Sequence, residues 1–220
     1  MNRSAIHGAS GRQMRSAETR AAILAAAGRI FAKSGLAGAR TDAIAAAAGV
    51  NKALLYYYFQ SKERLYEAVV EDHFREFNRR ALEVLTAPGP VRAVLLQYVS
   101  LHFDFISARH QFAPLFQQVT MTGGKFLERL IRKYFAPRSQ ALGKLIERGM
   151  RNGEFRRADG FHTALSIVSL IVFFFSAARV LQLLGHPDAY SRVNLKRRKR
   201  EVLDFIRHGV FADPNFSSHE

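Results

Sequence analysis

The chain has 220 residues, of which 48% are apolar and 23% are charged, so it is long enough to bury one full core. This composition excludes a chain disordered throughout, a collagen and a disulfide scaffold. Because cysteine is absent, thiolate nucleophiles and cysteine-ligated metal centres are excluded as well, and a cytoplasmic location is expected. The formal net charge of +15 favours nucleic acid or an anionic membrane surface as a partner.

Positive charge is concentrated near the N-terminus. Residues 1–64 contain 10 Lys and Arg against 3 Asp and Glu, which gives this short part of the chain a net charge of +7. The opening segment 1–16 carries Arg3, Arg12 and Arg15 but lacks the apolar run of a secretory signal. We therefore expect residues 1–16 to form a flexible basic arm.

One segment has the apolar character of a membrane helix. Residues 163–178 are sixteen uncharged residues, but they include three serines and are followed by Arg179. A spanning helix needs about 20 apolar residues. A buried helix or an interface helix is therefore the better prediction for this segment.

Apolar residues recur with a helical period along nearly the whole chain, which predicts an all-α fold without internal repeats. Gly35 is predicted to end the first helix, Thr41 to cap the second and Ser61 to cap the fourth. The predicted helices are 16–34, 41–48, 50–59, 61–85, 91–107, 112–121, 125–150 with an interruption near Pro137, 159–184 and 190–211.

The second and third predicted helices are short and are joined at Gly49. In the third helix, Leu55 and Phe59 share one face, whereas Lys52 and Tyr56 share another. One face can pack while the other presents hydrogen-bonding groups, as in a helix-turn-helix motif whose second helix enters the major groove of DNA.

The same residues carry a family resemblance. The stretch TDAIAAAAGV at 41–50, followed by NKALLYYYF at 51–59 and SKE at 61–63, resembles the DNA-binding domain of TetR (tetracycline-repressor-like) transcriptional regulators, strongly over 17–66. The resemblance implies an N-terminal three-helix DNA-binding domain followed by a helical ligand-binding and dimerisation domain. The expected division is an arm at 1–16, the DNA-binding domain at 17–64, the helical domain at 65–213 and a tail at 214–220.

Residue roles in DNA binding are carried over from the resemblance. It implies that residues approaching the bases are Lys52, Ala53, Tyr56 and Tyr57, and that residues holding phosphates are Thr41, Asn51, Tyr58 and Lys62. Ala53 replaces a frequent glycine, and Leu54 stands where a small or polar residue is common. Both departures leave the target sequence open, and Leu54 either meets a thymine methyl group or contributes little.

The second domain contains most of the 18 phenylalanines, which predicts an apolar cavity between helices, although core packing explains each residue equally well. The residues expected at this ligand pocket are Tyr98, His102, Phe103, Phe105, Phe112, Phe116, Gln117 and Met121. The residues expected at a dimer interface on the last helices are Phe173, Phe174, Phe175, Leu181 and Phe205.

Catalytic and metal-binding patterns are not evident in the sequence. The eight histidines lack His-Glu-x-x-His spacing, and neither a Gly-rich phosphate loop nor a Gly-x-Ser-x-Gly elbow occurs. We expect neither a metal nor another cofactor. The basic run 196–200 is expected to be the solvated face of a helix.

The resulting hypothesis is a homodimeric, ligand-responsive transcriptional regulator that binds a palindromic double-stranded operator and represses transcription. Its small-molecule effector is not specified by the sequence, and no membrane partner is expected. One alternative is a cationic peripheral membrane or scaffold protein that uses the +15 charge and the apolar helix. Another is a small all-α enzyme that acts on an apolar substrate.

Overall fold

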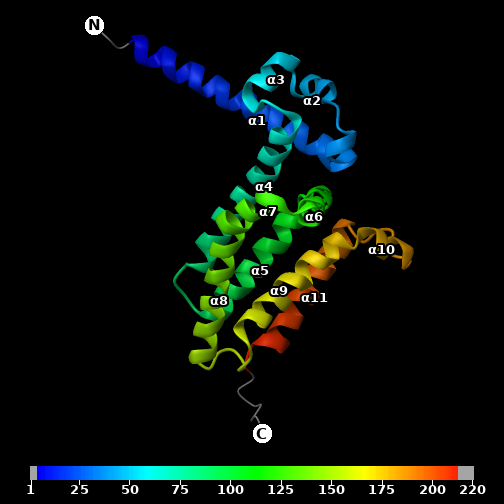
Figure 1. The fold of residues 1–220 in the computed structure, drawn as a ribbon. Coiled ribbons are helices and arrows are strands. Elements are labelled where there is room, and N and C mark those ends of the chain that lie inside the picture. The colour runs from blue at the N-terminus through cyan, green and yellow to red at the C-terminus, as the bar shows by residue number, and fades with distance from the viewer. Residues whose placement is uncertain (1–3, 213–220) are drawn as a thin grey trace. The chain divides into compact units, whose positions relative to one another are not determined.

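The computed structural model describes residues 4–212, with the side chains of 14–212 apart from those at 111, 114, 178 and 179. The chain forms two compact units, one holding the chain up to His73 together with Pro114–Thr122, the other holding Phe74–Ala113 and the chain from Gly123 onward. The helices are α1 Ser4–Gly38, α2 Thr41–Ala48, α3 Lys52–Phe59, α4 Lys62–Leu85, α5 Val91–Ser107, η1 His110–Phe112, α6 Ala113–Thr122, α7 Gly124–Leu130, η2 Ile131–Phe135, α8 Ala136–Arg151, α9 Gly160–Ser176, α10 Ala178–Leu183 and α11 Arg192–Val210 (Figure 1). The all-α prediction is confirmed.

The first helix differs from its prediction at both ends. It begins at Ser4, so residues 4–16, expected as a flexible arm, are helical. Gly35 interrupts the helix at φ 66° and ψ −178°, a conformation that an L side chain rarely adopts. The break predicted at Gly35 is therefore confirmed, but its backbone is extended in ψ rather than left-handed helical. Residues 1–3, with Arg3, and the tail at 214–220 lie outside the described residues.

Of the two helix N-caps predicted in the first unit, the one at Ser61 is confirmed, and Asn51 caps α3 in addition. The Asn51 side chain accepts a hydrogen bond from the Leu54 N–H at 2.7 Å, and Ser61 Oγ accepts one from the Arg64 N–H at 3.1 Å. The prediction for α2 is corrected, because its N-cap is Arg40, which makes no side-chain cap bond, and Thr41 is the first helical residue.

One described helix, Met14–Gly38, is long and apolar enough to cross a membrane by length and composition. Its residues Ile23, Ala27 and Phe31 are fully buried within the first unit. This burial is typical of a core helix in a globular domain. The apolar segment singled out in the sequence corresponds to α9, which is shorter.

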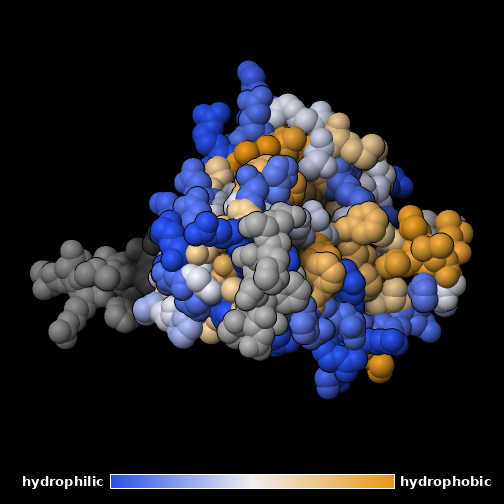
Figure 2. Space-filling model, turned by 90° about the horizontal axis from the view of Figure 1, so that it is seen from below, coloured by the Kyte–Doolittle hydropathy of each residue, from blue (hydrophilic) through white to orange (hydrophobic). Residues whose placement is uncertain are grey.

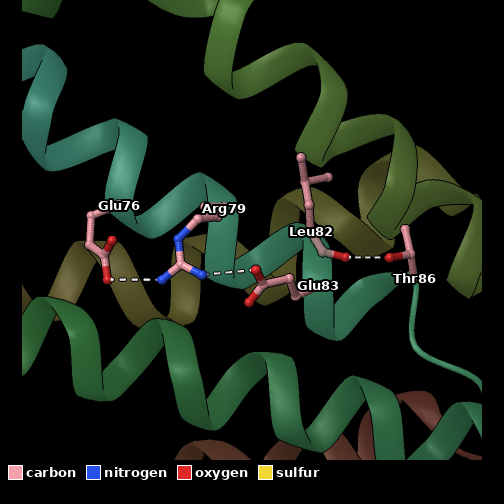
Figure 3. Close-up of polar contacts among 5 residues, drawn as sticks. All are labelled: Glu76, Arg79, Leu82, Glu83 and Thr86. Atoms are coloured by element: carbon pink, nitrogen blue, oxygen red, sulfur yellow. Dashed lines mark hydrogen bonds and ion pairs between the residues drawn. The ribbon is translucent and has the colours of Figure 1, made fainter. Parts of the chain in front are cut away.

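The exposed side of α4 carries an arginine held between two carboxylates one helical turn away on either side (Figure 3). The Arg79 guanidinium lies 2.8 Å from Glu83 Oε1 and 3.5 Å from Glu76 Oε1. One turn further on, Thr86 Oγ1 donates to the Leu82 carbonyl at 2.7 Å as the helix ends. Pro88 to Pro90 then separate α4 from α5, as predicted.

The core of the second unit forms where α5, α8, α9 and α11 pack against one another (Figure 1). Its buried residues include Leu95, Val99, Phe103, Leu142, Ile146, Ile167, Ile171, Phe175, Val202 and Ile206. At one end, Phe155 forms an isolated β-bridge with Phe211, and their rings stack with centroids 5.4 Å apart.

A single π-helical turn, η2, precedes α8. The Ala136 N–H donates to the Ile131 carbonyl, which is an i to i+5 bond. Pro137 follows directly and lacks the N–H that a regular helix would use here. The interruption predicted near Pro137 is therefore confirmed, and its physical form is a widened turn rather than a break.

The last helices show two differences from the predictions. The apolar helix predicted for 159–184 is divided at Ala177 into α9 and α10. The basic run on α11 is only partly solvated, since Arg198 donates to the Leu170 carbonyl at 2.9 Å and lies 5.5 Å from the Phe174 ring. Lys199 pairs with Asp104 at 2.6 Å. These two cations fasten α11 to α9 and α5.

Candidate DNA-binding site

The turn between α2 and α3 is fixed by backbone conformation and by a small core. Gly49 adopts the left-handed conformation, φ 69° and ψ 29°, and its N–H donates to the Ala46 carbonyl at 3.1 Å. Ile44 and Leu55 are fully buried, and Phe59 is nearly so. The inner faces of both helices are thereby held by the unit's core, which also contains the buried face of α1.

The outer face of α3 is open to solvent. Tyr57 is 78% exposed and Tyr56 is 37% exposed, while Lys52 and Ala53 are also exposed. Leu54 is half-buried. Exposing large aromatic side chains to water is unfavourable. An exposed pair of tyrosines beside a lysine therefore indicates a contact surface.

Polar groups on α2 and α3 hold each other in place. Lys52 Nζ forms an ion pair with Asp42 Oδ1 at 2.9 Å, and this hydrogen-bonded carboxylate raises the pKa of Lys52. The Tyr56 hydroxyl donates to Thr41 Oγ1 at 3.5 Å. Lys52 and Tyr56, two of the groups expected to contact bases, are thus positioned by neighbours on α2.

The residues assigned to phosphates also hold the unit together in the free protein. Asn51 caps α3, and the Tyr58 hydroxyl lies 3.0 Å from Ser16 Oγ on α1. Lys62 Nζ donates to the Ala37 and Ala39 carbonyls at 3.4 and 3.3 Å. Lys62 therefore satisfies carbonyls around the end of α1, a role that no pattern in the sequence predicts.

The arrangement suits DNA chemically. The exposed side of α3 presents one ammonium group and two phenol groups. The N–H groups at the start of α4 add an electric field that favours a bound phosphate. Donors of these kinds read base edges in the major groove and hold the backbone on either side.

The residues predicted for a ligand pocket divide between the two units. Tyr98, His102, Phe103 and Phe105 lie on α5 and are buried in the second unit. Phe112 is half-buried in η1 of the same unit. The other three, Phe116, Gln117 and Met121, lie on α6 in the first unit. The Met121 side chain is 88% exposed.

The residues predicted for a dimer interface differ in exposure. Phe173 on α9 and Phe205 on α11 are 70% and 64% exposed, whereas Phe174 and Leu181 are half-buried. Phe175 belongs to the core of its own chain, with its ring centroid 5.2 Å from that of Phe103. Phe175 is therefore a packing residue rather than a surface residue.

Sequence reasoning missed two features. Phe161 and Leu165 extend the exposed apolar face of α9, and their spacing of four residues, continued at Ser169 and Phe173, was the available signal. Arg138 is buried beside Tyr98 and His102. No pattern in the sequence distinguishes it from the other arginines.

Comparisons with known proteins agree with this geometry. Residues 23–69 match the model of the bacterial regulatory proteins of the tetR family, and residues 90–206 match the tetracyclin repressor-like C-terminal domain. The HTH-type transcriptional repressor NicS of Pseudomonas putida is 29% identical over 194 residues, covering 86% of this chain and 88% of NicS. The HTH-type transcriptional repressor SCO4008 of Streptomyces coelicolor is 49% identical over 91 residues, covering 40% and 46% of the two chains.

A solved structure shows the same fold. A transcriptional regulator from Saccharomonospora viridis, crystallised in complex with choline, superposes with a TM-score of 0.73 at 22% identity, covering 90% of this chain and all of that one. Together, the two family models cover most of the chain, including the turn at Gly49 and the helices of the second unit. The chain therefore belongs to the TetR family of transcriptional regulators.

Proposed function

We propose that this chain is a homodimeric, effector-responsive repressor that binds a two-fold symmetric operator through one α3 helix per subunit. The observation that carries the proposal is the exposed Lys52, Tyr56 and Tyr57 face on a helix whose opposite face is buried. The proposed repressor acts in the cytoplasm, where its operator DNA lies. This function requires neither a metal nor turnover of a substrate.

Repression is the proposed direction of regulation. NicS and SCO4008 are both named repressors. The HTH-type transcriptional activator FasR of Mycolicibacterium smegmatis, 37% identical over 89 residues, covers 40% of this chain. NicS matches along most of the chain, including the second unit, so its direction of regulation is the better support.

The proposed dimer uses the exposed faces of α9 and α11. Phe161, Leu165 and Phe173 form a stripe on α9, and Phe205 is exposed on α11. Figure 2 shows hydrophobic residues gathered at the surface on one side of the molecule. Water contact with such a stripe is unfavourable, and pairing two copies about a two-fold axis removes it from water on both.

Effector response follows from linkage. An effector that binds better to the subunit conformation with the wrong spacing of α3 helices weakens operator affinity by the same coupling factor. Successive major grooves on one side of B-DNA are about 34 Å apart. The helix α4 runs from the first unit into the second and is the proposed connection.

The membrane alternative lacks such support. The described helix that is apolar enough to cross a membrane buries Ile23, Ala27 and Phe31 in the core of the first unit, and residues 23–69 match the tetR family.

The first experiment is a selection from random duplexes at about 150 mM salt, where non-specific phosphate binding is weak. We expect enrichment of a palindrome with half-sites about one helical turn apart. Lys52→Ala should then erode discrimination at one position, whereas Lys62→Ala should weaken binding to all sequences. Arg157→Ala, which removes one exposed charge from the second unit, is the matched control. Failure to enrich any motif would overturn the proposal.

The dimer has a separate test. Phe173→Asp places a charge within the proposed interface at one end of the apolar stripe, and sedimentation should then show a monomer. Met121→Gln changes a residue that is even more exposed, on α6, and should leave the dimer intact. Equal sedimentation of the Phe173 variant and the unchanged protein would exclude this face as the interface.

A further inference from the structure

A group of buried polar side chains lies between α5 and α8 in the second unit. Tyr98 is fully buried, His102 is 3% exposed and Arg138 is 7% exposed. Each has a buried polar atom without a hydrogen-bond partner: the Tyr98 hydroxyl, His102 Nδ1 and Arg138 Nη1. We call these three residues, together with Phe77 and Phe135, the Arg138 cluster. Buried polar groups are normally hydrogen-bonded, so three orphaned atoms in one place need an explanation.

The contacts within the Arg138 cluster are aromatic. The guanidinium carbon of Arg138 lies 4.9 Å from the centroid of the Phe77 ring and 4.8 Å from that of Phe135. The His102 ring lies 4.5 Å from Phe77 and 5.7 Å from Tyr98, between centroids. These ring faces support the cation, and the Tyr98 hydroxyl lies near enough to interact with it, but Arg138 Nη1 has no hydrogen-bond acceptor.

The counterpart that Arg138 lacks is a carboxylate. On the surface of α4, Arg79 is held by Glu76 and Glu83 (Figure 3). In the described part of the chain, no ion pair to Asp or Glu is formed by Arg138, although it is far more buried than Arg79. A buried arginine without an anion is unfavourable, and a planar guanidinium matches a carboxylate with two parallel hydrogen bonds.

The position of Arg138 follows from the π-helical turn that precedes α8. The π-helical turn of η2 ends at Phe135, and Arg138 follows one turn later at the start of α8. This spacing puts the Phe135 ring against the guanidinium. Single π turns are frequent at functional sites, because they aim side chains that a regular helix would direct elsewhere.

The charge of the Arg138 cluster indicates what it accepts. Burial, aided by the nearby positive charge of Arg138, holds the pKa of His102 well below its ordinary value, so the imidazole is neutral at pH 7. Arginine stays protonated in proteins. The cluster therefore carries one positive charge, with one phenol donor beside it and aromatic rings around it.

We propose that the Arg138 cluster is the recognition point for the effector, and that the effector is a small monocarboxylate with an apolar body. Its carboxylate pairs with Arg138 and accepts a hydrogen bond from the Tyr98 hydroxyl. One negative charge matches the single cation, whereas a phosphate dianion would leave an unbalanced buried charge. The apolar body suits the phenylalanines of this core. This inference rests on the effector response proposed above.

The test compares acids with their uncharged amides. Thermal unfolding of the full chain is followed at pH 7.5 and constant ionic strength with acetate, hexanoate or benzoate, and with acetamide, hexanamide or benzamide. We expect at least one acid to raise the Tm by about 3–6 °C at ten times its Kd, and its amide to have no comparable effect.

Variants assign the effect to the cluster. Arg138→Met keeps the packing volume but removes the cation, and should abolish the difference between acid and amide. Tyr98→Phe should weaken acid binding about tenfold, as expected for one hydrogen bond to a charged group. Arg79→Met is the matched control, because it removes an arginine that already has two carboxylates.

Three results would overturn the inference: every amide matches its acid, none of the acids stabilises the unchanged protein, or Arg138→Met responds as the unchanged protein does. The acid–amide comparison needs no variant, so it decides the question even if Arg138→Met does not fold. Because these measurements contain no DNA, they are separable from operator binding. An acid that binds at Arg138 but does not release the selected operator would leave the site standing and refute the effector response.

Discussion

Two polar groups of side chains, one in each unit, make opposite use of hydrogen bonding. On α2 and α3, Lys52 pairs with Asp42 and Tyr56 bonds to Thr41, all at least partly exposed to solvent. In the Arg138 cluster, one polar atom of each of Tyr98, His102 and Arg138 is buried without a hydrogen-bond partner. An exposed pair can exchange its partner for DNA at little cost, since water compensates each group during the exchange. A buried group has no such compensation and is best satisfied by a ligand.

The largest effect expected concerns the support behind the DNA-binding face. Leu55→Ala removes a fully buried side chain from the core shared by α2 and α3, and should lower the free energy of unfolding by about 2–5 kcal/mol. Tyr57→Ala, two residues away and 78% exposed, should leave the unfolding midpoint unchanged but weaken operator binding. Urea unfolding and DNA titration of both variants measure the two effects. Similar losses of stability would contradict the assignment of an inner and an outer face.

The next effect tests whether the Arg138 cluster is unsatisfied in the free protein. Arg138→Met replaces a buried cation by an apolar side chain of similar length, and should leave the stability unchanged or raise it by up to about 2 kcal/mol. Urea unfolding without added acids is the measurement. A loss of several kcal/mol would mean that buried groups or water already satisfy the guanidinium, and the contrast between the two units would then fail.

The sequence was sufficient for most of the helices and for the buried and exposed faces of α3 because these depend on local patterns. Gly49, Leu55 and Phe59 fix the turn and the buried side of α3 through spacing alone, and the exposed side follows. The partners of Lys62 and Arg138 were not predictable. Lys62 reaches carbonyls of residues more than twenty positions earlier, and Arg138 meets Tyr98 across two helices, so tertiary packing decides both.

A pH-dependent effect separates the cluster from the surface pair. The pKa of His102 is held well below 6.5 in the folded chain, so as the pH falls below 6.5 the unfolded chain binds a proton that the folded chain does not. The stability contributed by neutral His102 is complete above pH 6.5 and is lost as the pH falls toward the lowered value. Between pH 6.5 and 5.5 the loss should be about 1 kcal/mol.

His102→Gln removes this titration. Urea unfolding at several pH values should show a shallower decline for the variant below pH 6.5, while the two proteins keep a constant difference above pH 7.5, which serves as the internal control. Parallel declines over the whole range would show that His102 takes up a proton as readily in the folded chain as in the unfolded chain, and would contradict its lowered pKa.

The smallest effect tests the surface pair itself. Asp42→Asn frees Lys52 and removes a negative charge beside the proposed DNA face, so affinity for random duplex should rise about threefold at 150 mM salt, with a steeper salt dependence. Asp188→Asn makes the same change of charge at an exposed position in the second unit and should have a smaller effect. If both variants bind alike, net charge alone explains the gain. A larger gain in DNA affinity for Asp42→Asn than for Asp188→Asn would show that the ion pair with Asp42 restrains Lys52 in the free protein. The ion pair would then keep the ammonium group correctly placed at little cost in free energy, and non-specific DNA would compete less well for it.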